Sequence, residues 1–176
     1  PGAMGAYVSE VMFWLYRPLT FMLWGGVFER FPRLKAMVVE GGTMFMVPSW
    51  LMLLDHNYTD IQFSAKLGDF RSHLSMAPSE YFARNCGIGA SCVPRRDLDL
   101  KDQIGLKQIM WGSDFPHPEG TWPNTEQYYL DTFKGFDADA GRQILGENAI
   151  QFYGMDSDYL NGLASDIGPS ASIFNG

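Results

Sequence analysis

The feature that most constrains the fold is a short apolar run that ends at a glycine, with an acid just beyond it. The run 108–111 stops at Gly112, and Asp114 follows. Two prolines and a further glycine come next and interrupt any regular structure. A buried strand that delivers a carboxylate in this way is typical of α/β proteins, whose functional groups lie at the carboxyl ends of parallel strands. Asp114 is therefore the first candidate for a catalytic residue.

Apolar runs alternate with segments of helical periodicity along the chain. Strands are predicted at 34–40, 81–86 and 106–111, each followed by a glycine. Helices are predicted over 43–55, 95–104, 124–133, 137–144 and 147–153, with a weak helix and a loop over 56–75 and an extended tail from 156. Strands that alternate with helices favour right-handed crossovers and a parallel sheet. The sequence therefore predicts an α/β fold, either an incomplete barrel or a small open sheet.

The segment Val11–Phe28 is the most apolar part of the chain. Arg17-Pro18 at its centre and Gly25-Gly26 near its end argue against a membrane span. We expect one or two buried helices, broken at Pro18. Such wide apolar coverage also predicts a covering surface from more protein, such as a partner subunit.

Composition sets the class of protein. With 176 residues the chain is long enough for one domain with a real core. The net charge of −7 arises entirely within residues 95–176, and no Lys/Arg cluster indicates nucleic-acid or anionic-membrane binding. Cys86 and Cys92 do not have the spacing of a CxxC pair, and no signal peptide is visible, so a cytoplasmic location is expected.

Glu40 is the second candidate catalytic residue, because it ends the first predicted strand as Asp114 follows the third. An unpaired carboxylate beside Ala36–Val39 would be costly to bury. Glu40 therefore either pairs with a cation, such as Arg17 or Arg84, or faces a site. If the two strand ends are neighbours, Glu40 and Asp114 form a pair able to handle protons.

The loop after Asp114 contributes two more candidates. His117 is available for acid–base work or substrate contact, and a solvent-facing role in a rigid turn is an equal alternative. Trp122 either covers a pocket or anchors the loop. His56 and His73 lie in polar surroundings without metal-ligand spacing, so surface or helix-end positions are expected for both.

These motifs together resemble a known family. The segments GSDFPHPEGTWP (112–123), GVFERFPRLK (26–35), VVEGG (38–42) and ENAIQFYG (147–154) are similar to the second half of an amidohydrolase-related protein. The similar branch contains aminocarboxymuconate-semialdehyde decarboxylase, and the resemblance runs from about Gly25 to Tyr153.

The resemblance implies a (β/α)₈ TIM barrel with a divalent metal, usually zinc, and a small-molecule substrate. Asp114 matches the metal-ligand Asp after the eighth strand, so the three predicted strands would be strands six to eight. A partial barrel domain is then expected over 1–155, with a tail over 156–176. The reaction implied is hydrolysis by a metal-activated water, or decarboxylation of a metal-bound carboxylated substrate.

The sequence departs from the family pattern in two ways. Glu40 stands where the decarboxylases have His, and the chain contains no HxH pair. We therefore expect a fragment that keeps one metal ligand and is inactive alone. Because two strand edges stay open, we also expect that the chain either associates with itself or lacks the other half of its barrel. The alternative is a non-catalytic truncated paralogue that acts as a folding or interaction module.

Overall fold

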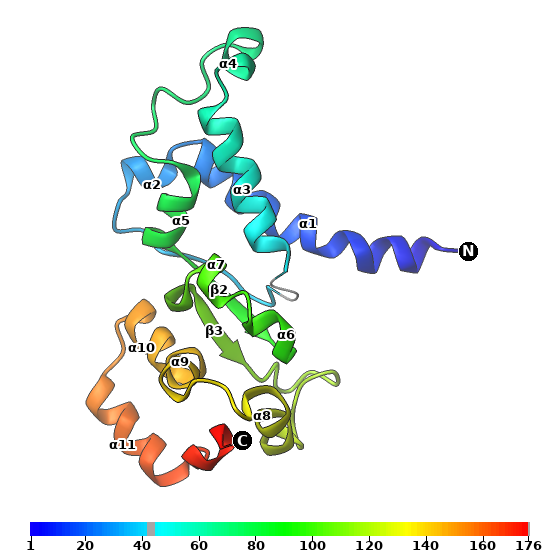
Figure 1. Ribbon diagram of the computed structural model, residues 1–176, viewed down its shortest axis with the longest axis vertical. Coiled ribbons are helices and arrows are strands. Elements are labelled where there is room, and N and C mark those ends of the chain that lie inside the picture. Colours follow the sequence, from blue (N-terminus) through cyan, green and yellow to red (C-terminus); the bar gives the residue numbers. More distant parts are fainter. Residues whose placement is uncertain (42–44, 176) are drawn as a thin grey trace.

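The chain forms a three-stranded parallel sheet with helices around it (Figure 1). The computed structural model describes residues 1–41 and 45–175. The strands are β1 (Ala36–Val38), β2 (Cys86–Ser91) and β3 (Ile109–Gly112), in the order β1-β2-β3. Val38 pairs with Ile88, and Ile88 pairs with Ile109. The predicted α/β class with a parallel sheet is confirmed.

The second strand lies five residues later than predicted. Residues 78–85 form helix α5 (Pro78–Asn85) because Pro78 starts a helix well and the Glu80 carboxylate accepts the Ala77 N–H at 2.8 Å. Gly87 and Gly89 belong to β2 rather than to its end. A Cβ at Gly87 would lie 2.8 Å from Met110 Cε and 3.2 Å from Phe152 Cε2, so the glycine lets these two side chains pack closely on the strand.

The first half of the chain supplies the helices on one side of the sheet, at the top of Figure 1. Helix α1 (Ala3–Trp24) is followed by the short α2 (Val27–Arg30), and α3 (Met46–Thr59) and α4 (Ile61–Leu67) precede α5. The predicted start of the third helix at Thr43 lies outside the described residues, and α3 runs four residues past the predicted end at Asp55. The core contains side chains of α1, α3, α5 and the sheet, among them Leu23, Val47, Phe82 and Ile88.

Helix α1 is one continuous helix with Pro18 inside it, so the predicted break is wrong. Only Tyr16, Leu19 and Leu23 on this helix are buried, and its first half projects from the body in Figure 1. The expectation of a fully buried segment is therefore also wrong. No helix in the described ranges combines the length and apolarity that crossing a membrane requires.

The second half of the chain supplies the remaining elements, most of them at the bottom of Figure 1. Their bounds are α6 (Arg95–Leu98), α7 (Lys101–Ile104), the 3₁₀ turn η1 (Leu106–Gln108), α8 (Thr125–Phe133), α9 (Ala138–Arg142), the π-turn η2 (Gln143–Glu147) and α10 (Asn148–Tyr153). The predicted helix over 95–104 is two short helices, and the strand predicted from Leu106 begins at Ile109 after η1. Asp137 caps α9 as predicted, because its side chain accepts the Ala140 N–H at 2.8 Å.

The predicted extended tail is helical. Helix α11 (Ser157–Ile167) is capped by Asp156, whose side chain accepts the Tyr159 N–H at 3.0 Å. The 3₁₀ turn η3 (Ala171–Phe174) then brings Phe174 back into contact with Phe133, with ring centroids 6.2 Å apart. The domain boundary after residue 155 stays a prediction.

Two buried asparagines hold the amino-terminal ends of the strands. Asn85 Nδ2 donates to the Pro32 and Leu34 carbonyls at 3.0 and 2.7 Å, ahead of β1. Asn148 Nδ2 donates to the Leu106 and Ile109 carbonyls at 2.8 Å each, at the start of β3. Both side chains are at most 2% exposed. The amino-terminal ends of the strands are therefore fixed by hydrogen bonds from buried side chains. The opposite, carboxyl ends of the strands, called the carboxyl edge of the sheet below, are followed by the loops described next.

Candidate active-site edge of the sheet

Each of the three strands is followed, at its carboxyl end, by a residue whose backbone has the left-handed conformation. Glu40 (φ 54°) comes after β1, Cys92 (φ 52°) after β2 and Asp114 (φ 60°) after β3. These are the non-glycine residues with positive φ in the described ranges 1–41 and 45–175. Such backbone costs about 1–3 kcal/mol per residue and clusters at functional sites. The carboxyl edge of the sheet therefore carries the strain of this fold.

Asp114 sits at the neck of a closed loop. The Ser113 carbonyl accepts the Thr121 N–H at 2.9 Å, which brings the two sides of the loop together. Inside the loop, the Asp114 carbonyl accepts the His117 N–H at 2.8 Å. A Cβ at Gly120 would lie 2.9–3.0 Å from three carbonyl oxygens, so only glycine fits this position. The loop thus holds the Asp114 side chain at the end of β3, where it is 19% exposed.

His117 lies next to two acids. Its Nδ1 is 2.7 Å from Glu119 Oε2 and 3.7 Å from Asp114 Oδ2, and its side chain is 60% exposed. The structure therefore brings the candidates Asp114 and His117 together and adds Glu119. A histidine in this place can exchange protons with solvent while its orientation is fixed by a carboxylate.

Cys92 is a further candidate residue at this end of the sheet, and the sequence did not indicate it. Its N–H donates to the Gly112 carbonyl at 3.4 Å, which joins the ends of β2 and β3, and its Sγ contacts the Glu119 carbonyl at 3.7 Å. Burial raises the pKa of its thiol, and the charges of Asp114 and Glu119 raise it further. Cys92 is the first residue after β2. A prediction of this strand at 86–91 would therefore have indicated Cys92 as a candidate.

Glu40 lies at the same edge but apart from Asp114. Strand β2 separates β1 from β3, so the two strand ends are about 10 Å apart across the sheet. The predicted carboxylate pair on neighbouring strands is therefore wrong. Glu40 is exposed, and the Gly41 N–H beside it donates to the Gly89 carbonyl at 2.9 Å, which anchors this end of β1 to β2.

The cationic partners considered for Glu40 are engaged elsewhere. The Arg84 guanidinium donates to the Phe28 carbonyl at 2.7 Å and to Asn85 Oδ1 at 2.8 Å. The Arg17 guanidinium lies over the Trp14 and Phe21 rings. No ion pair to Glu40 is found within 1–41 and 45–175. Of the two readings of Glu40, the ion pair with Arg17 or Arg84 is therefore wrong, and the reading that Glu40 faces a site stays a prediction.

Trp122 forms an exposed aromatic pair with Phe115 across the loop. The two ring centroids are 5.8 Å apart, edge to face, and both side chains are mostly exposed. Trp111 on β3 instead packs on Tyr129 with centroids 4.9 Å apart, as expected for a core residue. Trp122 thus lies on the solvent side of the loop that holds Asp114, where it can contact a ligand or a covering segment.

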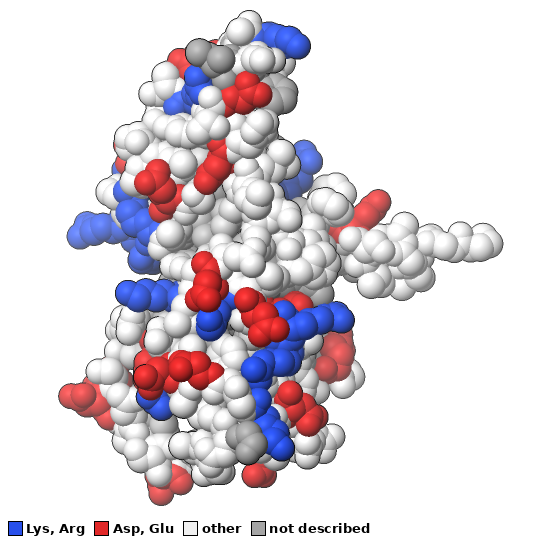
Figure 2. Space-filling view, viewed as in Figure 1, with Lys and Arg blue, Asp and Glu red and all other residues white. Residues whose placement is uncertain are grey.

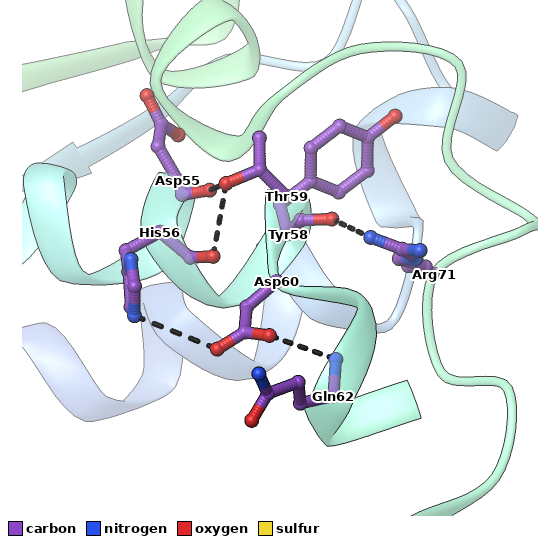
Figure 3. Close-up of polar contacts among 7 residues, drawn as sticks. All are labelled: Asp55, His56, Tyr58, Thr59, Asp60, Gln62 and Arg71. Atoms are coloured by element: carbon purple, nitrogen blue, oxygen red, sulfur yellow. Dashed lines mark hydrogen bonds and ion pairs between the residues drawn. The ribbon is translucent and has the colours of Figure 1, made fainter. Parts of the chain in front are cut away.

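The other two histidines lie at helix ends, as expected. His56 is in the last turn of α3, and its Nε2 is 3.8 Å from Asp60 Oδ2 (Figure 3). Figure 3 also shows Arg71 reaching back to the Tyr58 carbonyl at the same helix end. The His73 ring contacts the carbonyl of Trp24, the last residue of α1, at 2.8 Å. Neither histidine belongs to the carboxyl edge of the sheet.

The described residues do not form a complete metal site. Within 1–41 and 45–175, no group of three or more His, Cys, Asp or Glu side chains could hold a metal ion. Zinc centres need three or four protein ligands. The role of Asp114 as one of these ligands stays a prediction, and the residues of 1–41 and 45–175 do not complete the set.

Comparison with known proteins gives a consistent match. The amidohydrolase family model matches residues 15–155. A 2-amino-3-carboxymuconate-6-semialdehyde decarboxylase from Dictyostelium discoideum is 27% identical over 138 residues, covering 77% of this chain and 35% of that protein.

Solved structures agree with the sequence match. The 5-carboxyvanillate decarboxylase from Sphingomonas paucimobilis superposes with a TM-score of 0.61 and 28% identity, over 77% of this chain and 38% of that one. An amidohydrolase from Mycobacterium avium subsp. paratuberculosis gives a TM-score of 0.58 and 27% identity, over 74% and 31%. The chain thus spans between 31% and 38% of the length of these relatives.

Proposed function

The chain belongs to the amidohydrolase family, and we propose that it forms part of the active site of a metal-dependent hydrolase or decarboxylase that acts on a small molecule. The observation that carries this proposal is the row of strained residues at the carboxyl edge, with Asp114 in a closed loop at the end of β3. Carboxyl ends of parallel strands are where barrel enzymes place their catalytic groups. Two of the relatives are decarboxylases by name, which supports a carboxylated substrate.

We assign β1, β2 and β3 to strands six, seven and eight of a barrel. The parallel order and the two open edge strands support this assignment, because a closed barrel would pair the outer sides of β1 and β3 with further strands. The relatives are roughly twice as long as this chain, which leaves room for the other strands in the whole protein.

In this assignment Asp114 is a metal ligand, and the remaining ligands come from other parts of the whole protein. A divalent metal, zinc in our proposal, would supply Lewis-acid chemistry at this edge when bound. His117 orients or exchanges a proton with the substrate, and Trp122 covers it from the solvent side. Glu40 stays at the rim of the site, at the end of β1.

The experiment is an activity screen of the whole protein that carries this chain. CO₂ release and hydrolysis are followed separately on small carboxylated aromatic or unsaturated substrates, with and without a chelator. The proposal expects one of the two activities, lost on chelation and lost in Asp114→Asn. Full activity in Asp114→Asn, with its fold intact by circular dichroism, would show that the ligand assignment is wrong.

A second candidate is a non-catalytic interaction module. It is favoured by the incomplete ligand set in the described ranges and by the exposed apolar side chains of α1. The same screen separates the two candidates, because a non-catalytic module gives neither activity and binds no stoichiometric metal.

A further inference from the structure

The Asp114 carboxylate receives no hydrogen bond from the part of the chain that the structure describes. Its side chain is only 19% exposed, and the approach found in that part is His117 Nδ1, 3.7 Å from Oδ2. This distance is too long for a hydrogen bond. Most side-chain polar groups that are largely removed from water are hydrogen-bonded, so a carboxylate left in this state is available for a ligand.

His117 has two carboxylates within reach and pairs with the more exposed one. Its Nδ1 lies 2.7 Å from Glu119 Oε2, and the Glu119 side chain is 69% exposed. Electrostatic contacts are stronger where water is excluded, so the less exposed Asp114 would be the better partner if the ring were free to move. The geometry of the loop therefore decides the pairing in favour of Glu119.

Two consecutive turns of the loop produce this geometry. The first is closed by the His117 N–H, which donates to the Asp114 carbonyl at 2.8 Å. The second is closed by the Gly120 N–H, which donates to the His117 carbonyl at 3.0 Å. Within the second turn, the Glu119 carbonyl is contacted at 3.7 Å by Cys92 Sγ from the end of β2. The backbone of Glu119 is thus held by its own turn and by the neighbouring strand, with its carboxylate beside the His117 ring.

A small movement would give the ring to Asp114 instead. Because an N–H···O bond is about 2.9 Å long, a shift of about 1 Å would bring His117 Nδ1 into hydrogen-bond distance of Asp114 Oδ2. The backbone hydrogen bond already keeps residue 117 beside residue 114, so a rotation of the side chain is enough. Such a pair would occupy the Asp114 carboxylate, and a ligand would have to displace the ring.

We infer that Glu119 is a positioning residue: it holds the His117 ring away from Asp114 and so keeps the Asp114 carboxylate free for its ligand. The ligand is the divalent metal of the proposed function, on which this part of the inference rests. The hold on the ring rests on the loop alone.

The zinc affinity of the whole protein that carries this chain tests the inference. Metal-free parent and variants are titrated with Zn²⁺ in competition with a chelating dye. Glu119→Ala should bind Zn²⁺ at least fivefold more weakly, because a hydrogen bond to a charged group shifts an equilibrium about tenfold or more and this one is partly exposed. Glu119→Gln keeps an oxygen that accepts from Nδ1 and should stay within twofold of the parent. The double variant His117→Ala/Glu119→Ala removes the competing ring and should also return to within twofold.

A simple loss of charge predicts a different pattern. Figure 2 shows acidic and basic side chains interspersed over the lower half of the molecule, so one exposed charge has a small effect on the field at Asp114. Glu126→Ala, which removes an exposed acid on α8, is the matched control and should bind Zn²⁺ like the parent. A loss in Glu119→Gln equal to that in Glu119→Ala, or a double variant that stays weak, would overturn the inference.

The crystal structure of the metal-free Glu119→Ala protein separates this inference from the proposed function. His117 Nδ1 should there lie within about 3.2 Å of Asp114 Oδ2. A ring that stays where the parent has it overturns the inference, whatever the protein binds. If the ring moves as expected but the parent binds no Zn²⁺, the proposed metal is refuted and the hold of Glu119 on the ring is confirmed.

Discussion

Replacing Asn148 by Asp tests how the start of β3 is held in place. The Asn148 side chain is 2% exposed, and its Nδ2 donates to the Leu106 and Ile109 carbonyls at 2.8 Å each. The substitution keeps the shape of the side chain but exchanges both N–H donors for an acceptor. The carbonyl oxygens of Leu106, which is part-buried, and Ile109, which is buried, then lose their partner and face a carboxyl group.

The magnitude follows from these two contacts. An intramolecular hydrogen bond contributes about 1 kcal/mol net, and an unsatisfied buried group costs about 1–3 kcal/mol. Asn148→Asp should therefore lower the free energy of unfolding by about 2–5 kcal/mol at pH 7. Burial beside two carbonyl oxygens also raises the pKa of the introduced carboxyl above its unfolded value of about 3.9. The protonated form recovers one donor, so the difference from the parent is largest at neutral pH and shrinks as the pH falls through the raised pKa.

The assay is urea unfolding of parent and variant at pH 7 and pH 4.5, followed by circular dichroism. Asn161→Asp is the matched control, because Asn161 is exposed on α11, and it should change stability by less than about 0.5 kcal/mol. A loss below 1 kcal/mol in Asn148→Asp, or a loss that grows as the pH falls, would refute the role assigned to these hydrogen bonds.

Three other perturbations test the fold. Gly41→Ala should cost about 1–3 kcal/mol in the same urea assay, because its Cβ would lie 2.5 Å from Ile88 Cγ2. Gly146→Ala, with no atom within 4 Å of its Cβ, should not destabilise the chain. Hydrogen bonds from Ser72 and from the backbone lower the pKa of Asp69 to about 2 from 3.8, so its stabilisation is complete above pH 3.8 and is lost as the pH falls towards 2. Carboxyl NMR titration checks this, and an ordinary pKa for Asp69 would contradict it. Phe174→Ala should lower the free energy of unfolding by about 3 kcal/mol, because its contacts with the core are lost. A truncation on the exposed face of α11 should change the free energy of unfolding little. Equal effects of the two changes would show that η3 does not pack on the core.

The sequence predicted the part of the fold that rests on local signals. The apolar run before Gly112 placed β3 within three residues, and Asp137 correctly marked the start of α9. The α/β class with a parallel sheet followed from the alternation of elements. These signals depend only on neighbouring residues, which is why they could be read without the structure.

The errors arose where tertiary packing outweighs local pattern. Gly87 and Gly89 look like a chain break, but they lie inside β2 because side chains of the neighbouring strands occupy the space a Cβ would need. The pairing of Glu40 with Asp114 failed because the sheet keeps the order of the sequence, so that β2 lies between β1 and β3 and the two strand ends are not neighbours. Phe174 was missed because its contact with Phe133 is long-range.

The candidate site was predictable only in part, for the same reason. Asp114 and His117 were found because they share one loop. Cys92 was not found, because its contact with the Glu119 carbonyl depends on the β2–β3 pairing. Glu119 was overlooked although it lies in the same loop, two residues after His117.

The most direct test of the central claim is the metal content of the whole protein that carries this chain. Parent, Asp114→Asn and the control Asp102→Asn, an exposed acid on α7, are purified identically and measured by inductively coupled plasma mass spectrometry. Because Asn keeps the shape of Asp and tolerates the left-handed backbone at this position, the fold should persist. We expect one divalent metal per chain in the parent and in Asp102→Asn, and a metal content well below one per chain in Asp114→Asn. Equal metal content in all three proteins would contradict the assignment of Asp114 as a ligand.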